Sequence, residues 1–343
     1  MLTLKLKVDP ISPDPAAVSE AARIIKRGGL VGMPTETVYG LAANALDEQA
    51  VKNVFIAKGR PQDNPLIVHI SDIGMMLPLV TDFPENAKRC ADAFWPGPFT
   101  MILPRSQVIP KSVCAGLDTV AIRMPSDPVA NMLIKLSGVP IAAPSANISG
   151  LPSPTTAERV VEDMDGKIDA VLMAGPSAVG VESTVVTFAG PAPRLLRPGG
   201  ITLEQLREII PDITVDPAVL QKAEEGKPVA SPGMKYKHYS PKCEVFLIKG
   251  TAEQYSDYVN QNAVDGACAL CFAEDAPLLR AKYFVYGKSD DGAAQASGLF
   301  DALRVLDDEG YSICYAHAPD TRGVGLAVYN RLIRAAAFKV IVL

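Results

Sequence analysis

Residues 28–41 read GGLVGMPTETVYGL, and this stretch sets the class of the fold. An amphipathic helix is expected over 14–27, and Gly28–Gly29 end it. Leu30–Met33 then reads as a strand. A helix that leads into a short apolar strand through a Gly-Gly turn indicates an α/β domain.

The same alternation of helices and short apolar strands continues beyond this stretch. Capping residues and apolar spacing predict helices over 47–58, 127–137 and 202–210. Short apolar runs predict strands near residues 66–70, 100–103, 119–124, 139–143, 170–173 and 183–188. We therefore expect an α/β domain over residues 1–210.

The composition changes after residue 210, and a second pattern follows. Residues 211–241 are rich in Pro, Lys and Glu and read as a linker. Beyond it, strands are expected at 244–248, 267–272, 282–286, 312–316 and 339–342, and helices at 251–262, 292–309 and 324–338. This pattern predicts a smaller, open, Rossmann-like α/β sheet over residues 242–343.

The overall composition is that of an ordinary folded protein. Hydrophobic residues make up 48% and charged residues 21% of the 343 residues, and the net charge is −5. This charge argues against a protein that coats nucleic acid over its whole surface. Every apolar run is far shorter than the ~18 residues of a membrane-spanning helix. The N-terminus alternates like a strand rather than a signal peptide, so a cytoplasmic protein is expected.

Six cysteines are scattered along the chain. Cys268 and Cys271 form a C-x-x-C, a spacing that occurs in redox and zinc sites. They lie in the apolar run ACALCF, however, and neither a second C-x-x-C nor a nearby His completes a metal site. We interpret them as thiols of a buried strand.

Polar clusters follow several expected strands of the first domain, where open α/β sheets bind ligands. The hydroxyl-rich loop PTETVYGL, which contains Thr37, follows the strand at 30–33. Lys58-Gly-Arg60 ends a helix, and two cations at this spacing suit phosphate oxygens. A third cluster, PSANISG, occupies residues 144–150. Taken singly, the hydroxyl-rich loops are also consistent with ordinary polar turns.

Two further polar residues lie within apolar strands. Arg123 is near the end of the strand that begins at Thr119. A buried guanidinium requires an anion, which is either an internal carboxylate or a ligand; because ligand-type clusters lie nearby, we favour the carboxylate of a small substrate. His69 is interpreted as a site residue because it follows the cationic turn, although an isolated His in such a strand is more often a core residue.

These motifs together resemble the YrdC-type family, which is marked by a K-x-R and S-x-N tetrad. The tetrad is present here as Lys58, Arg60, Ser145 and Asn147. The stretches PTETVYGL, RPQDNPLIVH, TVAIRMP and APSANISG are similar as well. SPGMKYKHYSP (231–241) is similar to the longer members, L-threonylcarbamoyladenylate synthases with an added C-terminal α/β domain. The resemblance implies a YrdC-like twisted α/β sheet around a positively lined cavity.

The resemblance also implies an activity. Such enzymes join ATP, L-threonine and bicarbonate into L-threonylcarbamoyladenylate, with magnesium accompanying ATP, and release pyrophosphate. Partner proteins then transfer the threonylcarbamoyl group to an adenosine of tRNA; direct contact of this chain with tRNA is left open. Because the carbamate of threonine attacks the α-phosphorus, catalysis is expected to rest on positioning and charge neutralisation by the tetrad.

Carried over residue by residue, the resemblance implies three sets of site residues. ATP is expected to contact Lys58, Arg60, Asn64, Thr119, Ser145, Asn147, Ser153 and Arg197. L-Threonine is expected to contact Thr37, His69, Arg123, the backbone of Ala143, and Ser183, with Arg123 on its carboxylate. Tyr236, His238 and Tyr239 are expected to close over the cavity as a lid. The magnesium ligands are left open.

Three other functions are weighed. The main alternative is a YrdC-type module that binds RNA without synthase activity, but the near-neutral charge of residues 1–210 disfavours a general RNA binder. Carbamoyl transfer from carbamoyl phosphate is disfavoured because acylphosphatase-like and zinc-finger segments are absent from the sequence. A regulatory nucleotide sensor would bind its ligand without turnover. The role of the C-terminal domain and the oligomeric state are left open.

Overall fold

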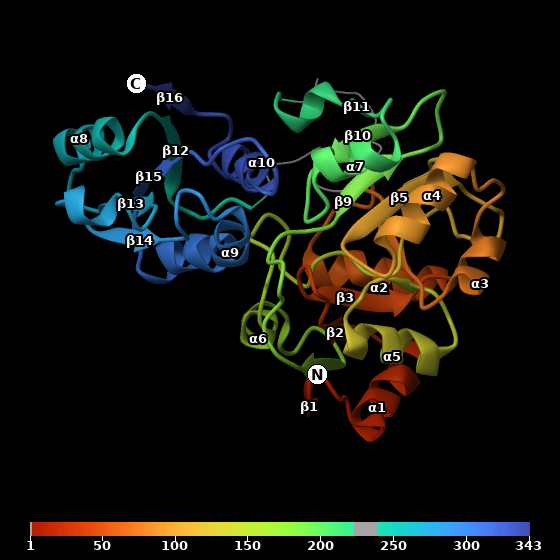
Figure 1. Cartoon of the computed structure of the whole chain (residues 1–343). Helices are drawn as coiled ribbons and strands as arrows, with labels where there is room; N and C mark the ends of the chain where they lie inside the picture. Colours follow the sequence, from red (N-terminus) through yellow and green to blue (C-terminus); the bar gives the residue numbers. More distant parts are fainter. Residues whose placement is uncertain (1, 223–238) are drawn as a thin grey trace. The chain divides into compact units, whose positions relative to one another are not determined.

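The computed structural model describes residues 2–222 and 239–343 (Figure 1). These residues divide into two compact units. The first contains residues 2–149 and 153–216, and the second contains residues 150–152, 217–222 and 239–343. Residues 150–152 thus belong to a different unit from the residues on either side of them. Within the described ranges, no helix is long and apolar enough to cross a membrane.

The first unit is built on one mixed sheet, to which eleven strands of the described residues contribute. In chain order these are β1 (Leu4–Lys7), β2 (Val31–Met33), β3 (Gly40–Asn44), β4 (Ile67–His69), β5 (Phe99–Pro104), β6 (Thr119–Arg123), β7 (Ile141–Ala142), β8 (Ala170–Met173), β9 (Thr184–Thr187), β10 (Arg194–Arg197) and β11 (Thr214–Val215). Across the sheet they run β1-β8-β2-β3-β7-β4-β6-β5-β9-β10-β11. Strand β6 is parallel to β4 and antiparallel to β5, so strand ends and strand beginnings meet at the centre of the sheet.

Helices cover both faces of this sheet. They are α1 (Pro15–Lys26), α2 (Glu48–Lys58), α3 (Ile73–Met76), the 3₁₀ turn η1 (Leu77–Leu79), α4 (Glu85–Phe94), α5 (Pro128–Ser137), α6 (Ala157–Met164) and α7 (Leu203–Ile209). Successive side chains of a strand point to opposite faces, so Ala42 and Ala43 of β3 belong to two different buried clusters. Helices α1 and α5 close the cluster of Ala42, whereas α2, α4, α6 and α7 contribute to the cluster of Ala43.

Local sequence explains where the helices begin and end. Asp14, Asp47 and Asp127 each accept a hydrogen bond from a backbone N–H in the first turn of α1, α2 and α5, respectively. Gly59 ends α2 in the left-handed conformation, with φ at 60°, which glycine adopts without strain. Lys58 is therefore the last helical residue, and the chain turns sharply after it.

The second unit is built on a sheet in which every neighbouring pair of described strands is parallel. Its strands are β12 (Glu244–Lys249), β13 (Ala267–Cys271), β14 (Tyr283–Val285), β15 (Ile313–His317) and β16 (Val340–Val342), in the order β14-β13-β15-β12-β16. The helical segments are η2 (Pro217–Val219), α8 (Ala252–Asn262), η3 (Ala276–Leu278), α9 (Gly292–Asp308) and α10 (Gly325–Ala335). The expected open α/β sheet is confirmed, although its strand order differs from the 3-2-1-4-5-6 order of dinucleotide-binding folds.

The C-x-x-C lies on strand β13, in which every residue is buried. Cys268 and Cys271 are three residues apart on this strand, so their side chains point to opposite faces of the sheet. All six cysteines are buried as thiols. The interpretation of this motif as part of a buried strand is confirmed.

The segment that was expected to be a linker, 211–241, carries ordered structure in its first part. Thr214 and Val215 pair in parallel with β10. The segment 217–222 belongs to the second unit, where Val219 is 1% exposed. This differs from the expectation because single buried apolar residues and backbone hydrogen bonds, rather than a long apolar period, hold the segment.

The glycine-rich turn after β10 predicts a stability effect. A Cβ atom at Gly199 would overlap backbone atoms of residues 182–184, so the Gly199→Ala variant requires a backbone shift. We expect its free energy of unfolding to fall by about 1–3 kcal/mol, measured by urea denaturation. In the matched control, Gly190→Ala, the new methyl group meets its nearest atom at 4.0 Å, so a change within about 0.5 kcal/mol is expected. Equal stabilities of the two variants would contradict the packing described here.

Candidate functional site

Lys58 joins two of the sequence motifs. Its ammonium lies at the C-terminal end of α2, and the residue is 2% exposed. Nζ donates to the carbonyl oxygen of Ser145 at 2.5 Å and to that of Asn147 at 2.6 Å. The backbone N–H of Ser149 in turn donates to the carbonyl of Lys58 at 2.9 Å. The structure thus brings the K-x-R and S-x-N motifs together, with a cation fixed against the loop that follows β7.

Arg60 and Asn64 lie in the turn after α2. Arg60 donates to the carbonyl oxygens of Asn64 at 3.2 Å and Pro65 at 3.4 Å. The Asn64 side chain is 1% exposed, and neither of its amide atoms meets a hydrogen-bond partner among the described residues. A buried amide in this state costs about 1–3 kcal/mol, which is typical of a residue that serves a ligand.

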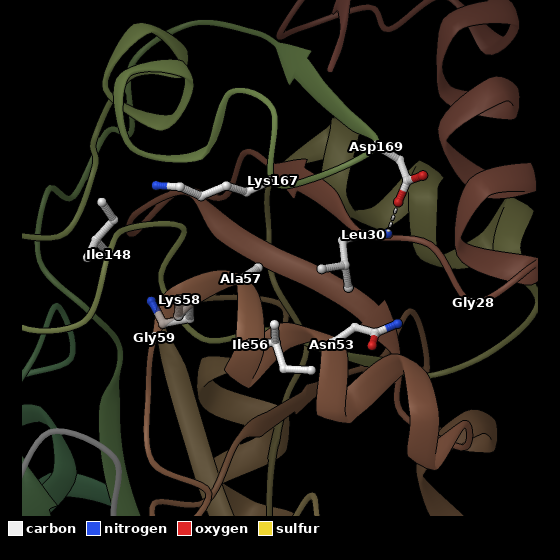
Figure 2. Close-up of a pocket in the computed structure, with 10 residues that line it drawn as sticks. All are labelled: Gly28, Leu30, Asn53, Ile56, Ala57, Lys58, Gly59, Ile148, Lys167 and Asp169. Carbon is white, nitrogen blue, oxygen red and sulfur yellow. Dashed lines mark hydrogen bonds between the residues drawn. The ribbon is translucent and has the colours of Figure 1, made fainter. Parts of the chain in front are cut away.

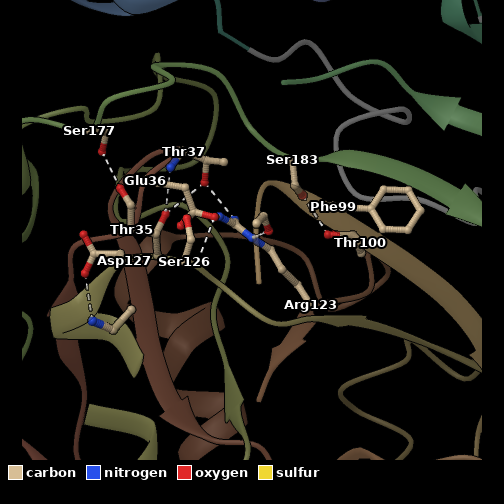
Figure 3. A network of polar contacts seen from close by, with 12 residues as sticks. Thr35, Glu36, Thr37, Phe99, Thr100, Arg123, Ser126, Asp127, Ser177 and Ser183 are labelled. Carbon is tan, nitrogen blue, oxygen red and sulfur yellow. Dashed lines mark hydrogen bonds and ion pairs between the residues drawn. The ribbon is translucent and has the colours of Figure 1, made fainter. Parts of the chain in front are cut away.

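Arg123, the last residue of β6, is the centre of a buried polar network (Figure 3). Its NH2 group lies 2.8 Å from Oε1 of Glu36, its NH1 group donates to Oγ1 of Thr37 at 2.7 Å, and Nε donates to the carbonyl of Gly97 at 3.4 Å. Of the two anions that the sequence left open, the internal carboxylate is present. Whether a substrate carboxylate also contacts Arg123 stays a prediction.

Glu36 is the residue that the sequence reasoning missed. It lies in the PTETVYGL loop, and its carboxylate also accepts from the backbone N–H of Ser126 at 3.2 Å. Burial opposes ionisation of Glu36, but the Arg123 charge and these hydrogen bonds lower its pKa below the ordinary value. The only sequence signal was an acidic residue between two threonines, in a chain that also needed a partner for Arg123.

His69 lies beside Arg123 because β4 and β6 are parallel with these two residues in register. Its side chain is buried, at 3% exposure, and Nδ1 is 3.2 Å from the carbonyl oxygen of Ile67. Burial, and secondarily the Arg123 charge, lowers the pKa of His69 to about 3. The imidazole is therefore neutral at physiological pH and adds no charge to the network.

Ser183 contacts both Thr100, which lies beside Arg123 in the sheet, and Arg197, which is predicted to bind ATP. Its hydroxyl is 2.7 Å from Oγ1 of Thr100, which is paired in register with Arg123. Arg197, at the end of β10, donates through Nε to the carbonyl of Ser183 at 3.0 Å and through NH2 to its hydroxyl at 3.1 Å. Ala143 follows β7, and its N–H donates to Ile67 at 3.0 Å. These contacts bring Thr37, His69, Arg123, Ala143 and Ser183 into one cluster.

The other two predicted ATP residues lie in different places. Ser153 donates to Oε1 of Glu182 at 2.6 Å, directly beside Ser183 in the sequence. Thr119 is the first residue of β6, and Arg123 is the last. Four residue-to-residue steps along the extended strand separate them by roughly 13 Å, with both side chains on the same face. A ligand that contacts both must therefore be elongated along β6.

The predicted lid is described only at its end. Tyr236 and His238 lie outside the described residues. Tyr239 belongs to the second unit, where it is 5% exposed, its ring stacks on Phe300 at 5.1 Å, and the Arg331 guanidinium lies 5.7 Å above it. This is the position of a packed core side chain, and the closure of Tyr239 over the cavity stays a prediction.

A separate surface pocket of about 630 Å³ borders the site (Figure 2). It is lined by Gly28, Leu30, Asn53, Ile56, Ala57, Lys58, Gly59, Ile148, Lys167 and Asp169. Lys167 donates to the carbonyl of Asp163 at 2.7 Å, and Asp169 accepts from the N–H of Leu30 at 2.8 Å. The charged groups are thus turned to the protein, and the pocket shares only Lys58 with the residues predicted to bind substrates.

Comparison with known proteins gives matches over nearly the whole chain. The family model Sua5_yciO_yrdC, described as "Telomere recombination", matches residues 23–199. A second model, Sua5_C, described as "Threonylcarbamoyl-AMP synthase, C-terminal domain", matches residues 201–337.

Individual relatives cover both regions. The threonylcarbamoyl-AMP synthase of Bacillus subtilis is 46% identical over 97% of this chain and 96% of its own length. That of Pyrococcus abyssi is 44% identical over 94% of both chains. A crystal structure of Pyrococcus abyssi Sua5 in complex with L-threonine superposes with a TM-score of 0.93 at 42% identity, covering 99% of this chain and 100% of that one. Escherichia coli YciO, at 20% identity and a TM-score of 0.53, shares the fold over 58% of the chain.

The environment of His69 predicts its titration. Because its pKa in the folded state lies below the ordinary value of 6.5, His69 stabilises the fold above pH 6.5, and this contribution is lost as the pH falls toward 3. We expect the His69 imidazole resonances, assigned by comparison with a His69→Gln variant, to stay at neutral-form positions from pH 8 down to pH 5. A titration midpoint above pH 5 would show that the ring is not sealed from solvent.

Proposed function

The chain belongs to the Sua5/YciO/YrdC family, in the long form that carries a Sua5 C-terminal domain, and from this we propose that it makes threonylcarbamoyl-AMP. The substrates are ATP, L-threonine and bicarbonate, and pyrophosphate is released. The reaction is a nucleotidyl transfer, because the adenylyl group of ATP moves to a carbamate oxygen. The Pyrococcus relative in complex with L-threonine, which matches over the whole chain, supports threonine as the amino-acid substrate.

The observation that carries the proposal is the connection between two sets of side chains. One set, around Lys58, gathers cationic and amide groups suited to phosphates. The other, around Arg123, gathers groups suited to a small amino acid. Arg197, which is predicted to bind ATP, donates to Ser183 of the second set at 3.0 and 3.1 Å. A product that links an amino acid to a nucleoside monophosphate requires this arrangement.

The chemistry then follows from positioning. The threonine amine adds to carbon dioxide derived from bicarbonate, which forms a carbamate and releases a proton. A carbamate oxygen attacks the α-phosphorus of ATP, the bond from that phosphorus to the bridging oxygen of pyrophosphate breaks, and pyrophosphate leaves. Lys58 and Arg60 counter the developing phosphate charge, Asn64 orients the phosphates, and Ser145, Asn147, Ser153 and Thr119 line the nucleotide.

The contacts of Arg123 and His69 determine the net charge around the predicted threonine site. Because Glu36 neutralises Arg123 and His69 is neutral, this set carries little net charge of its own. It can therefore hold the threonine carboxylate through the remaining N–H groups of Arg123 without strongly holding the amine as an ammonium. That property favours the neutral amine that carbamate formation needs.

Magnesium is proposed to arrive on the ATP phosphates. The described residues contain no group of three or more His, Cys, Asp or Glu side chains placed to hold a metal ion, and Mg²⁺ in such sites is commonly bound by substrate phosphates and water. When bound there, it would neutralise phosphate charge. We further propose that the product passes to proteins that transfer the threonylcarbamoyl group to tRNA.

The test of the activity is pyrophosphate release by the purified chain from ATP and magnesium, with threonine and bicarbonate each omitted in turn. We expect release only when both are present, with threonylcarbamoyl-AMP detected by mass spectrometry. Pyrophosphate release in the absence of threonine, or ATP binding without any turnover, would overturn the proposal. A salt-sensitive RNA gel shift without nucleotide would then favour an RNA-binding module.

The role of Arg123 gives a sharper prediction. Removing a hydrogen-bonding cation from a carboxylate costs about 1.5–3 kcal/mol, so Arg123→Met should raise the KM for threonine roughly 10- to 100-fold and leave the KM for ATP within about 3-fold. The control is Arg105→Met, because Arg105 is also buried in this unit, at 6% side-chain exposure, but donates to the carbonyl of Leu117 at 3.0 Å.

Because Arg123→Met leaves Glu36 buried without its cation, the double variant Glu36→Gln/Arg123→Met is measured in parallel. It removes both charges of the pair. An unchanged KM for threonine in a folded variant of either kind would exclude Arg123 from substrate binding.

A further inference from the structure

The surface pocket beside Lys58 has the size and lining of a site for a small organic ligand. Its volume of about 630 Å³ lies in the range that proteins use for such ligands. All of its lining residues belong to the first unit. Leu30 is part of the buried core of this unit, and Ala57 packs against the same core. The pocket therefore opens directly onto the apolar interior.

Two isoleucines that line the pocket are exposed to solvent. Ile56, in the last turn of α2, is 71% exposed, and Ile148, in the loop after β7, is 36% exposed. They come from different elements and lie on different sides of the pocket (Figure 2). A ligand that covers both side chains would remove apolar surface from water, which favours binding.

The pocket is open because two helices end beside it. Gly28 follows the end of α1 with φ at 83°, and Gly59 follows the end of α2 with φ at 60°. A residue in this left-handed conformation ends a helix, so the chain turns away at both positions. At Gly59, an added Cβ atom would meet no atom within 4 Å. The opening is therefore set by the local sequence.

Lys167 places a positive charge at one end of the pocket. Its side chain runs along one edge and points toward Ile148 (Figure 2). Nζ donates to the carbonyl oxygen of Asp163 at 2.7 Å. A carbonyl carries no net charge, so this bond positions the ammonium without neutralising it. Of its three N–H donors, two are left for a ligand in the part of the chain that the structure describes.

The other two charged groups of the lining are engaged by the protein. The Lys58 ammonium donates to the carbonyl oxygens of Ser145 and Asn147. The Asp169 carboxylate accepts from the N–H of Leu30 at 2.8 Å, and it lies at the end of the pocket opposite the Lys167 ammonium (Figure 2). An anionic group of a ligand is therefore favoured at the Lys167 end.

We propose that this pocket binds a small organic anion, whose apolar body covers Ile56 and Ile148 and whose charged group contacts Lys167. The site is separate from the proposed substrate site, because it shares only Lys58 with the residues predicted to bind ATP and threonine. The inference goes beyond the proposed function and does not require it.

The test uses anilinonaphthalene sulfonate (ANS) as the probe, titrated against the full chain and followed by fluorescence. We expect saturable binding. Ile56→Ser should raise the Kd about 10-fold, because apolar contact is lost, and Lys167→Met should raise it about 3-fold, because an exposed charge pair is lost. Phenylnaphthylamine, which has the same rings without the sulfonate, should bind more weakly and respond only to Ile56→Ser.

Matched controls use the same substitutions elsewhere in the first unit. Ile11 is 83% exposed and Lys135 is exposed on α5, and neither lines the pocket. Ile11→Ser and Lys135→Met should leave the Kd for ANS unchanged. Saturating ATP and threonine should leave ANS bound. Thermal unfolding of each variant checks that the fold is intact, which is expected because all four side chains are exposed.

Three results would overturn the inference: no saturable binding of ANS, the same Kd in the pocket variants as in the controls, or complete displacement of ANS by ATP. Phenylnaphthylamine that binds as tightly as ANS would show that the pocket takes a neutral apolar group, which overturns the assignment of an anion. Failure of the proposed function would appear in pyrophosphate release alone and would leave the ANS comparison unchanged.

Discussion

The buried ion pair between Arg123 and Glu36 is the contact on which the site depends. It ties the end of β6 to the loop after β2, although these segments are far apart in the sequence. Breaking such a pair by removing one partner costs several kcal/mol, because the other charge stays buried. The pair therefore fixes the loop that carries Thr37, and through the register of β4 and β6 it also fixes His69 beside the guanidinium.

From this pair the site extends along the sheet in two directions. Toward β9 and β10, Thr100, Ser183 and Arg197 form a continuous chain of hydrogen bonds. Toward α2, the sharp turn at Gly59 leaves Lys58 facing the loop after β7. Because the mixed sheet brings strand ends and strand beginnings together at its centre, residues from separate sequence motifs meet there without long connecting loops.

Much of this could be predicted from the sequence, and the parts that could not have identifiable causes. Helices with a capping Asp and a terminal Gly, such as α2 and α5, were predicted within about a residue. Strand β3 was missed because its residues, GLAAN, include no β-branched or aromatic side chain. Helices α4 and α6 were missed as well, and α6 is short. The tetrad was found through its motif. Glu36 was missed because its partner, Arg123, is 87 residues away in the sequence. A local sequence pattern does not predict a contact between residues so far apart.

Three buried side chains of the second unit anchor other segments by donating to backbone carbonyl oxygens. Arg304, Asn330 and Arg334 donate to the carbonyls of Pro152, Val219 and Ala218, respectively. Every amino acid supplies such a carbonyl, including proline. The held segments can therefore change their side chains during evolution without losing the contacts, whereas the donors cannot. Divergence among relatives should accordingly be tolerated in the loops and opposed on the inward faces of α9 and α10.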